Sequence, residues 1–279
     1  MDYLTCLSDL PGKVELIKGE NTNSTSKCVI PKLLFQTWKT RGNIPEKWIP
    51  GQESIKKWMG SWVHIITDDN DNRNFIQKHY PDYLAQYDSF PHNIQRADFV
   101  RPFLLHKFGG LYMDMDIVVQ KPLDDLFTTD GDVFLVMSGN VTSCTTNSFM
   151  ASKKGADFWK IYFGEMCAPL PWWTIFGRHW IIMSSTGPMS LNRAFKKAQS
   201  SVVILPSKHV MPCSVCDNVV CDADGAFLRP LEGQSWVGVD SKFYNFVICH
   251  YTEIIFVFVV IILLILLALL ITWIMRKYK

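Results

Sequence analysis

The sequence predicts one α/β domain followed by a single membrane-spanning helix near the carboxyl end. Three features of the chain support this prediction. Its 279 residues are enough for one large α/β domain or two small ones. Short strand-like runs alternate with segments of helical periodicity, and no linker divides them. Residues 254–275 form an apolar block without a charged side chain.

The expected elements follow this alternation from residue 29 onward. Apolar and β-branched runs predict strands at residues 29–38, 62–67, 111–113, 117–119, 133–137 and 202–205. Apolar residues spaced by three and four predict helices at residues 52–58, 71–80, 93–107, 155–166 and 191–198. This order is typical of a mainly parallel sheet covered by helices. Residues 1–28 are polar toward their end, and we expect a leader of uncertain order before a domain at residues 29–250.

The apolar block at residues 254–275 predicts a membrane span. Its 22 residues would form a helix of about 33 Å, enough to cross about 30 Å of bilayer hydrocarbon. A core helix of a soluble protein is usually shorter and amphipathic. A basic tail at residues 276–279 follows directly, and the positive-inside bias keeps such a tail in the cytoplasm. We expect a single-pass protein of an endomembrane such as the ER or Golgi.

The side of the membrane on which the domain lies stays open. The basic tail favours the lumen, and so do the glycosylation patterns that begin at Asn23 and Asn140. However, the first residues lack the apolar core of a signal peptide, and a carboxyl-terminal span without one normally leaves its domain in the cytosol.

The eight cysteines leave several alternatives. Cys213, Cys216 and Cys221 follow His209 closely, so they could form disulfides, bind zinc or remain thiols. We favour disulfides, although the redox compartment decides between these alternatives. The other cysteines are scattered and are expected to be ordinary thiols: Cys6, Cys28, Cys144, Cys167 and Cys249.

The charges argue against a nucleic-acid partner. The 28 basic and 26 acidic side chains are interspersed, the net charge is +2, and no basic stripe is visible.

The most informative stretch of the chain is residues 96–119. A helix ends at Gly109 and Gly110, where the backbone can turn sharply. The short strand that follows runs into Asp114 and Asp116, and strand alternation places both carboxylates on one side. Two adjacent carboxylates coexist most easily around a cation, and their hard oxygens suit Mg²⁺ or Mn²⁺.

A second pair of charges lies just upstream. Asp98 and Arg101 are one helical turn apart and share a face. A carboxylate and a guanidinium can grip sugar hydroxyls, while a cation between two carboxylates stabilises the charge of a departing nucleoside diphosphate. The residues therefore predict transfer of a sugar from a nucleotide-sugar. The plain alternative for Asp98 and Arg101 is a structural ion pair within the helix.

In this order the stretch resembles the DXD sugar-binding region of glycosyltransferase family 32. That family includes fungal α-mannosyltransferases and the catalytic subunits of mannosyl-inositol-phosphoceramide synthases, and the glucosyltransferase domains of clostridial toxins are more distantly similar. The resemblance is carried by Arg96, Asp98, Arg101, Gly109, Gly110, Tyr112, Asp114 and Asp116. It implies a GT-A fold, which is a single Rossmann-like nucleotide-sugar-binding domain, with Mn²⁺ or Mg²⁺ as cofactor and retention of anomeric configuration.

The resemblance implies roles for further residues. Gln36 and Trp38 correspond to the end of the family's first strand, which approaches the nucleoside, and residues 185–188 resemble a turn near the acceptor. Glu232, Ser235 and Trp236 resemble the closing element that meets the metal and the β-phosphate. The catalytic residues implied are Asp98, Arg101, Asp114 and Asp116, and the metal ligands Asp114, Asp116 and Glu232. The donor would contact Gln36, Trp38, Asp98, Arg101, Tyr112, Asp114, Ser235 and Trp236. Core packing is the ordinary alternative for Trp38 and Tyr112.

Two positions depart from the family pattern. Pro102 lies inside the expected helix and should kink or restart it. Val237 stands where relatives often have a His that could reach the metal. The carboxyl-terminal metal ligand therefore stays open among Glu232, Asp240 and His250.

We expect a metal-dependent retaining glycosyltransferase that transfers a hexose from GDP-mannose or a UDP-hexose to a glycan or glycolipid acceptor. The alternative is a catalytically impaired membrane-anchored protein that uses the same fold to bind sugar-nucleotides or to scaffold a partner.

Overall fold

The computed structural model describes residues 9–17, 28–40, 42–137, 144–213, 216, 223–231, 233 and 236–278. At the centre of this part of the chain lies a seven-stranded sheet. In spatial order its strands are β1 (Lys13–Leu16), β3 (Val63–Thr67), β2 (Leu33–Thr37), β4 (Gly110–Met113), β7 (Thr145–Ser152), β6 (Val133–Met137) and β8 (Val202–Leu205).

The sheet is mixed, which corrects the prediction of a mainly parallel one. β2 runs parallel to β3 and β4, and β6 runs parallel to β8. β1 is antiparallel to β3, and β7 is antiparallel to both β4 and β6. β7 is absent from the expected strands because its sequence, TTNSFMAS, is largely polar. Its residues are nevertheless buried or half-buried, because the strand is paired on both edges.

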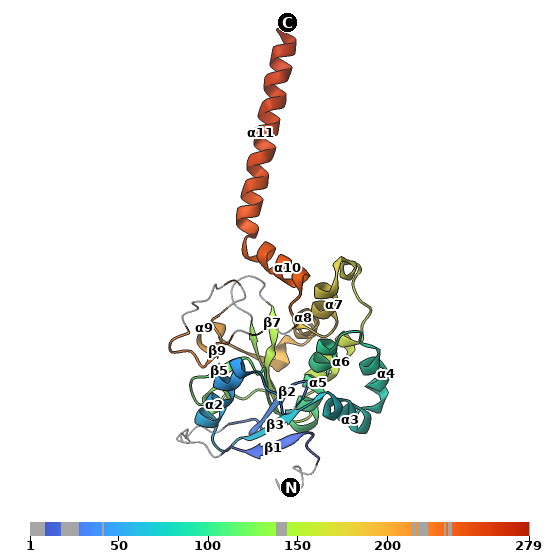
Figure 1. Ribbon diagram of the computed structural model, residues 1–279, viewed down its shortest axis with the longest axis vertical. Helices are drawn as coiled ribbons and strands as arrows, with labels where there is room; N and C mark the ends of the chain where they lie inside the picture. The colour runs from blue at the N-terminus through green and yellow to red at the C-terminus, as the bar shows by residue number, and fades with distance from the viewer. Residues whose placement is uncertain are drawn as a thin grey trace.

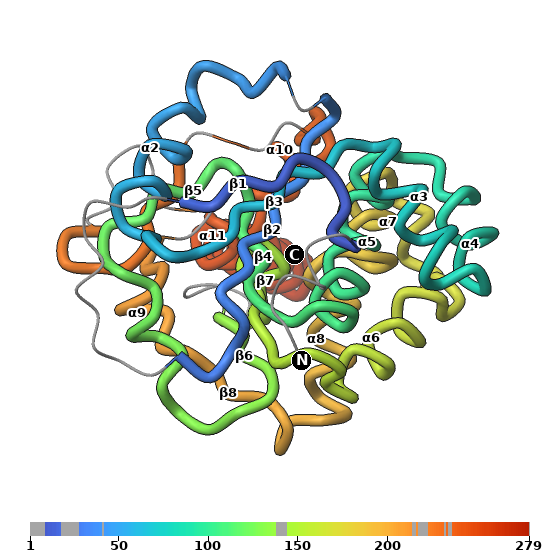
Figure 2. Tube along the Cα trace, turned by 90° about the horizontal axis from the view of Figure 1, so that it is seen from below, coloured from blue at the N-terminus to red at the C-terminus, as the bar shows by residue number. Residues whose placement is uncertain are grey.

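Helices cover both faces of the sheet, which confirms the predicted α/β class (Figure 2). Alternation along the strands divides the apolar side chains, so that Phe35 and Tyr112 join one core while Leu34 and Leu111 join the other. The first core is covered by α3 (Asp69–His79), α5 (Asn93–Phe108), α6 (Phe158–Met166) and α8 (Pro188–Lys197). The second is covered by α2 (Ile49–Trp58), the 3-10 helix η3 (Leu123–Phe127) and α9 (Ser207–Val210).

A small second sheet brings the late part of the chain back to the middle of the molecule. It pairs β5 (Ile117–Val119) with β9 (Leu228–Pro230) in antiparallel fashion. The remaining short elements of the domain are η1 (Glu46–Trp48), η2 (Pro81–Tyr83), α4 (Leu84–Ser89), η4 (Trp172–Phe176), α7 (Arg178–Ser185) and η5 (Gln199–Ser201).

Two details differ from the sequence-based expectations. β1 lies within the segment expected to be a polar leader, and its four exposed residues form an edge strand on β3. α5 runs through Pro102 as one helix, so the predicted restart is wrong. Pro102 cannot donate to the carbonyl of Asp98. The buried neighbours Phe99 and Phe103 hold the helix against the core.

The carboxyl end of the described chain forms two consecutive helices, α10 (Val239–Cys249) and α11 (Tyr251–Lys277), separated by His250 alone. α11 extends away from the domain (Figure 1). Its apolar window has a mean hydropathy of 3.9, and none of it is buried, so among the described helices it alone has the length and composition to cross a membrane. This helix fits the predicted single-pass anchor.

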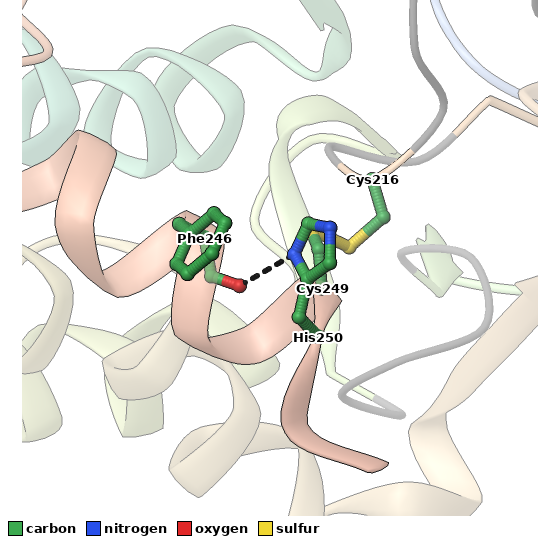
Figure 3. The surroundings of a disulfide bond; sticks show 4 residues. All are labelled: Cys216, Phe246, Cys249 and His250. Carbon is green, nitrogen blue, oxygen red and sulfur yellow. Dashed lines mark hydrogen bonds between the residues drawn. A yellow bond between two sulfur atoms is a disulfide. The ribbon is translucent and has the colours of Figure 1, made fainter. Parts of the chain in front are cut away.

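Cys216 and Cys249 form a disulfide, which joins the cysteine-rich loop to the last turn of α10 (Figure 3). The expectation that Cys249 is an ordinary thiol is therefore wrong, because spacing along the chain cannot reveal a partner 33 residues away. Cys213 is disulfide-bonded as well. Its neighbour Cys221 and the glycosylation patterns at Asn23 and Asn140 lie outside the described residues.

Candidate active site

The site is built at the end of β4, and two glycines set its position. Gly109 and Gly110 both have positive φ, of 72° and 100°. A Cβ on Gly109 would lie 2.7 Å from the backbone nitrogen of Lys154, and one on Gly110 would lie 2.5 Å from the carbonyl oxygen of Leu33. Since any larger residue would be strained and would collide with backbone, Gly110 lets β4 pack directly against β2, and Gly109 allows the close approach of the segment after β7.

The guanidinium of Arg101 joins the two predicted pairs of charges. Its Nη2 lies 2.9 Å from Oδ1 of Asp98, on the same helix, and 3.1 Å from Oδ1 of Asp114, at the end of β4. Nη1 donates to the carbonyl of Asn147 on β7. The structural pair expected within the helix therefore exists, but it is also shared with the first carboxylate of the acidic pair.

Tyr112 contacts both Arg101 and Asp114. Its ring lies 4.6 Å from the centre of the Arg101 guanidinium, and its hydroxyl donates to Oδ1 of Asp114 over 2.9 Å. Asp114 directly follows the strand, two residues after Tyr112, and lies on the same side as the Tyr112 hydroxyl. Asp98 and Arg101 are almost fully buried, whereas the side chain of Asp114 is 28% exposed, so Asp114 is where this cluster meets solvent.

Burial and shared charge together shape the electrostatics of the cluster. Burial raises the pKa of Asp98 to about 7, against the opposing effects of Arg101, Asn147 and Thr186. Burial also raises the pKa of Asp114, although Arg101 and Tyr112 act in the other direction. Two carboxylates thus compete for one guanidinium, and a further cation beside Asp114 would favour its charged form.

Gln36 occupies the centre of a buried polar network behind Asp114. Its Nε2 donates to the backbone carbonyl of Asp114 over 3.3 Å, and its Oε1 lies within 2.9 Å of side-chain nitrogens of Gln52 and His64. Burial lowers the pKa of His64 to about 4, so this ring is neutral at neutral pH. Gln36 is only 1% exposed, and its hydrogen bond to the Asp114 carbonyl holds the backbone of the acidic pair in position.

Asp116 faces the returning carboxyl-terminal segment. Its backbone carbonyl accepts a hydrogen bond of 2.6 Å from the amide of Leu231, just beyond β9. A Cβ on Gly233 would lie only 1.7 Å from Oδ2 of Asp116, so the backbone of residue 233 lies directly against this carboxylate. The pairing of β5 with β9 produces this contact, which no local pattern in the sequence could indicate.

The other predicted site residues have more varied positions. Trp38 follows β2, donates from Nε1 to the carbonyl of Asn43 and packs edge-on against Trp48. Trp236 stacks on His179 of α7, with ring centroids 5.9 Å apart. Glu232 and Ser235 lie outside the described residues.

Of the further metal-ligand candidates, Asp240 accepts a hydrogen bond from the amide of His179 at the start of α7. His250 lies between α10 and α11. Within the described chain, no group of three or more His, Cys, Asp or Glu side chains is arranged to hold a metal.

The turn at residues 185–188 reaches the charged cluster. Ser185 accepts a hydrogen bond of 2.7 Å from Gln95 of α5, one turn before Asp98. Thr186 lies beside Asp98 and helps to favour its charged form. Nε of Arg101 is buried and has no hydrogen-bond partner among the described residues. Buried polar atoms rarely remain unpaired, so this nitrogen marks a place that a ligand could complete.

Comparisons with known proteins agree with the motif. Residues 45–132 match the family model of the glycosyltransferase sugar-binding region containing the DXD motif, and this range includes the whole charged cluster from Asp98 to Asp116. The resemblance predicted from the sequence is therefore confirmed.

Two relatives cover longer parts of the chain. Inositol phosphoceramide mannosyltransferase 3 of Schizosaccharomyces pombe is 31% identical over 86% of this chain and 65% of its own length. Mannosyl phosphorylinositol ceramide synthase CSH1 of Saccharomyces cerevisiae is 29% identical over 61% of this chain and 43% of its own length. The chain thus spans less than two thirds of either relative. Among solved structures, the PaToxG glycosyltransferase covers 64% of this chain at 17% identity, with a TM-score of 0.45 over 73% of that protein.

Proposed function

We propose that this chain, which carries the sugar-binding region of the DXD-motif glycosyltransferases, is a metal-dependent retaining glycosyltransferase. Its donor would be a nucleotide-sugar, either GDP-mannose or a UDP-hexose. The observation that carries this proposal is the guanidinium of Arg101, held between Asp98 and Asp114, with its buried Nε left without a partner. A sugar hydroxyl offers the acceptor oxygen that Nε lacks.

The acidic pair fits a divalent cation. Asp114 and Asp116 offer hard carboxylate oxygens two residues apart, and the side chain of Asp114 is 28% exposed, which leaves room for phosphate oxygens. Asp116 would hold Mn²⁺ or Mg²⁺ directly, Asp114 would share the metal shell with the donor ribose, and Glu232 is the proposed third ligand. When bound, the cation would stabilise the charge that develops on the two phosphates of the leaving group.

The side chains around the pair would keep it in position. Tyr112 and Arg101 both contact Oδ1 of Asp114, and Gln36 holds its backbone carbonyl, so this carboxylate has little freedom to turn. Such preorganisation costs nothing at the moment of reaction and favours the transition state over the bound substrate. Asp98 and Arg101 would orient the sugar through its hydroxyls.

The reaction would proceed by attack on the face from which the phosphate leaves. The bond between C1 of the sugar and the β-phosphate oxygen breaks, a bond from C1 to the acceptor hydroxyl oxygen forms, and the hydroxyl proton passes to the departing phosphate. Asp98 is not assigned the role of nucleophile, because it is 4% exposed and is held by Arg101.

A glycolipid acceptor is favoured over a free glycan. The relatives are named for mannosyl transfer to inositol phosphoceramide, which is a membrane lipid. The apolar helix α11 would hold the catalytic domain beside such a substrate. GDP-mannose is accordingly the first donor to test, and an endomembrane the first location.

The experiment is a donor panel with the purified full-length chain in detergent micelles. With Mn²⁺ and inositol phosphoceramide, we expect one nucleotide-sugar to be consumed, a product with retained anomeric configuration by NMR, and no turnover after chelation. Asp116→Ala should abolish turnover, whereas Asp82→Ala, which removes an exposed carboxylate in η2, should not. Equal turnover in wild type and Asp116→Ala would contradict the proposal. Metal-dependent donor binding without transfer would instead support the binding or scaffold alternative.

A further inference from the structure

Large apolar side chains are concentrated on one part of the domain surface. Outside α11, twelve large hydrophobic residues of the described chain are exposed, and seven of them fall within residues 170–176 and 239–246. These belong to η4 with the residues just before it, and to α10. Contiguous apolar patches on a soluble surface usually mark contact with something other than water.

In α10, large apolar side chains face solvent. Val239, Phe243 and Phe246 follow the i, i+4, i+7 spacing of a single helical face, and they are 87%, 60% and 57% exposed. On another face of the same helix, Ser241 is buried and lies 3.1 Å from Nδ1 of His179. The helix therefore presents these three apolar side chains to solvent, while Ser241 faces the protein.

η4 shows the same exposure. Trp172 and Ile175, three residues apart in a 3-10 helix, share one side and are 71% and 78% exposed. Phe176, at the end of this turn, is 56% exposed. η4 and α10 touch, because the hydroxyl of Tyr244 on α10 donates to the backbone carbonyl of Phe176 over 3.0 Å. The exposed apolar side chains of η4 and α10 therefore lie on adjacent elements.

This surface is continuous with the proposed membrane anchor. Only His250 separates α10 from α11, and the disulfide from Cys249 to Cys216 ties the last turn of α10 to the domain (Figure 3). In Figure 1, α10 and the yellow segment before α7 lie at the end of the domain from which α11 departs. A bilayer crossed by α11 would therefore begin beside them.

We propose that η4 and α10 form a docking surface that lies on the lipid bilayer around the foot of α11. Tryptophan and phenylalanine side chains at a membrane-facing surface match the composition of the bilayer interface, where aromatic rings meet headgroups and acyl chains. Burial in lipid would remove from water the apolar face that α10 exposes. The domain would then rest on the membrane instead of swinging on a single helix.

The docking surface would also set the distance between the membrane and the proposed active site, a consequence that rests on the proposed function. α7 has eight residues and a length of about 12 Å. Its first turn contacts α10 through His179 and Asp240, and its last residue, Ser185, contacts α5 next to Asp98. The sugar pocket would then be separated from the docking surface by at most about the length of this short helix.

Tryptophan quenching by brominated lipids tests the docking surface without any assay of activity. The full-length chain is placed in phosphatidylcholine vesicles whose acyl chains carry bromine near the headgroup. Difference spectra between wild type and Trp172→Phe isolate the signal of η4. Trp273→Phe reports in the same way on insertion of α11, and Trp58→Phe on α2, which Figure 1 places in the lower part of the domain.

We expect brominated lipid to quench the Trp172 and Trp273 signals and to leave the Trp58 signal unchanged. In the double variant Ile175→Glu, Phe243→Glu, the Trp172 signal should become quenchable by aqueous iodide instead of lipid. Both substituted side chains are more than half exposed, so this variant should fold. Quenching of Trp273 without Trp172, equal lipid quenching of Trp172 in the charged variant, or no quenching of Trp273 would each overturn the docking surface. None of these outcomes depends on whether the protein transfers a sugar.

Discussion

The charged cluster at the end of β4 and the apolar docking surface on η4 and α10 both depart from the usual distribution of side chains, in which apolar groups are buried and charged groups are exposed. The cluster buries charge, since Asp98 and Arg101 are 4% and 5% exposed. The surface exposes apolar rings, with Trp172 71% in contact with solvent. Buried charges are costly unless they are paired, so the cluster depends on mutual contacts within the fold. Exposed apolar side chains make few such contacts. Substitutions in the docking surface should therefore change the stability of the fold little, and their effect should depend on whether lipid is present.

The largest expected effect is the loss of the shared guanidinium. Arg101→Leu leaves Asp98 buried without its partner and should lower the free energy of unfolding by about 3–5 kcal/mol. Chemical denaturation of the full-length chain in detergent measures this change. The double variant Asp98→Asn, Arg101→Leu removes the unpaired charge and should recover part of the loss. If Arg101→Leu unfolds as the wild type does, the cluster is not held by mutual contacts.

The neutral His64 behind the acidic pair gives a pH-dependent effect of similar size. Its folded pKa is about 4 and its ordinary value is 6.5, so the unfolded chain takes up the proton first as the pH falls. Stability should therefore decrease from pH 6.5 to pH 4, by about 3 kcal/mol from this group alone. Denaturation at pH 7 and pH 4, compared between wild type and His64→Gln, isolates the contribution. An identical pH dependence in both proteins would show that His64 is not buried in its neutral form.

Gly233 connects the cluster to the segment that leads into α10, and its substitution should affect activity more than folding. A Cβ at this position meets Oδ2 of Asp116, so Gly233→Ala must displace the carboxylate or the loop. Disturbing a supporting residue of a metal site typically costs about 10–100-fold, and kcat/KM should fall by that order. Gly164→Ala in α6, where a Cβ meets nothing within 4 Å, is the matched control. Unchanged kinetics in Gly233→Ala would show that this loop does not support the proposed metal site.

The smallest expected effect belongs to the docking surface when lipid is absent. Val239→Ser removes an apolar side chain that is 87% exposed, and exposed positions of this kind usually change the free energy of unfolding by within about 0.5 kcal/mol. Denaturation in detergent should therefore barely distinguish this variant from wild type. A large loss would mean that α10 packs against the protein more tightly than its exposure indicates.

Local patterns predicted much of the fold and the centre of the site. Strands β6 and β8 have the expected limits, and α5 differs from its expected range by one residue. Asp98 and Arg101 meet because a helix brings residues three apart together, and Tyr112 and Asp114 because a strand does so at a spacing of two. The residues of each pair are no more than three positions apart in the chain.

Other features depend on pairings between distant segments. β7 is polar in sequence but is buried because it pairs with β4 on one edge and with β6 on the other. The network of Gln36 with His64 requires β2 and β3 to align, and the disulfide requires the cysteine loop to reach α10. Gly233 is an ordinary loop glycine until the pairing of β5 with β9 places it on Asp116.

The sequence by itself determined the α/β class, the apolar helix at the carboxyl end and the identity of the charged residues. These features depend only on residues that are close together in the chain. Only the tertiary structure decided that Arg101 is shared between Asp98 and Asp114, that the sheet is mixed, and that α10 turns its apolar face outward beside η4. These features come from contacts between segments far apart in the chain, whose geometry is set when the sheet and its helices pack together.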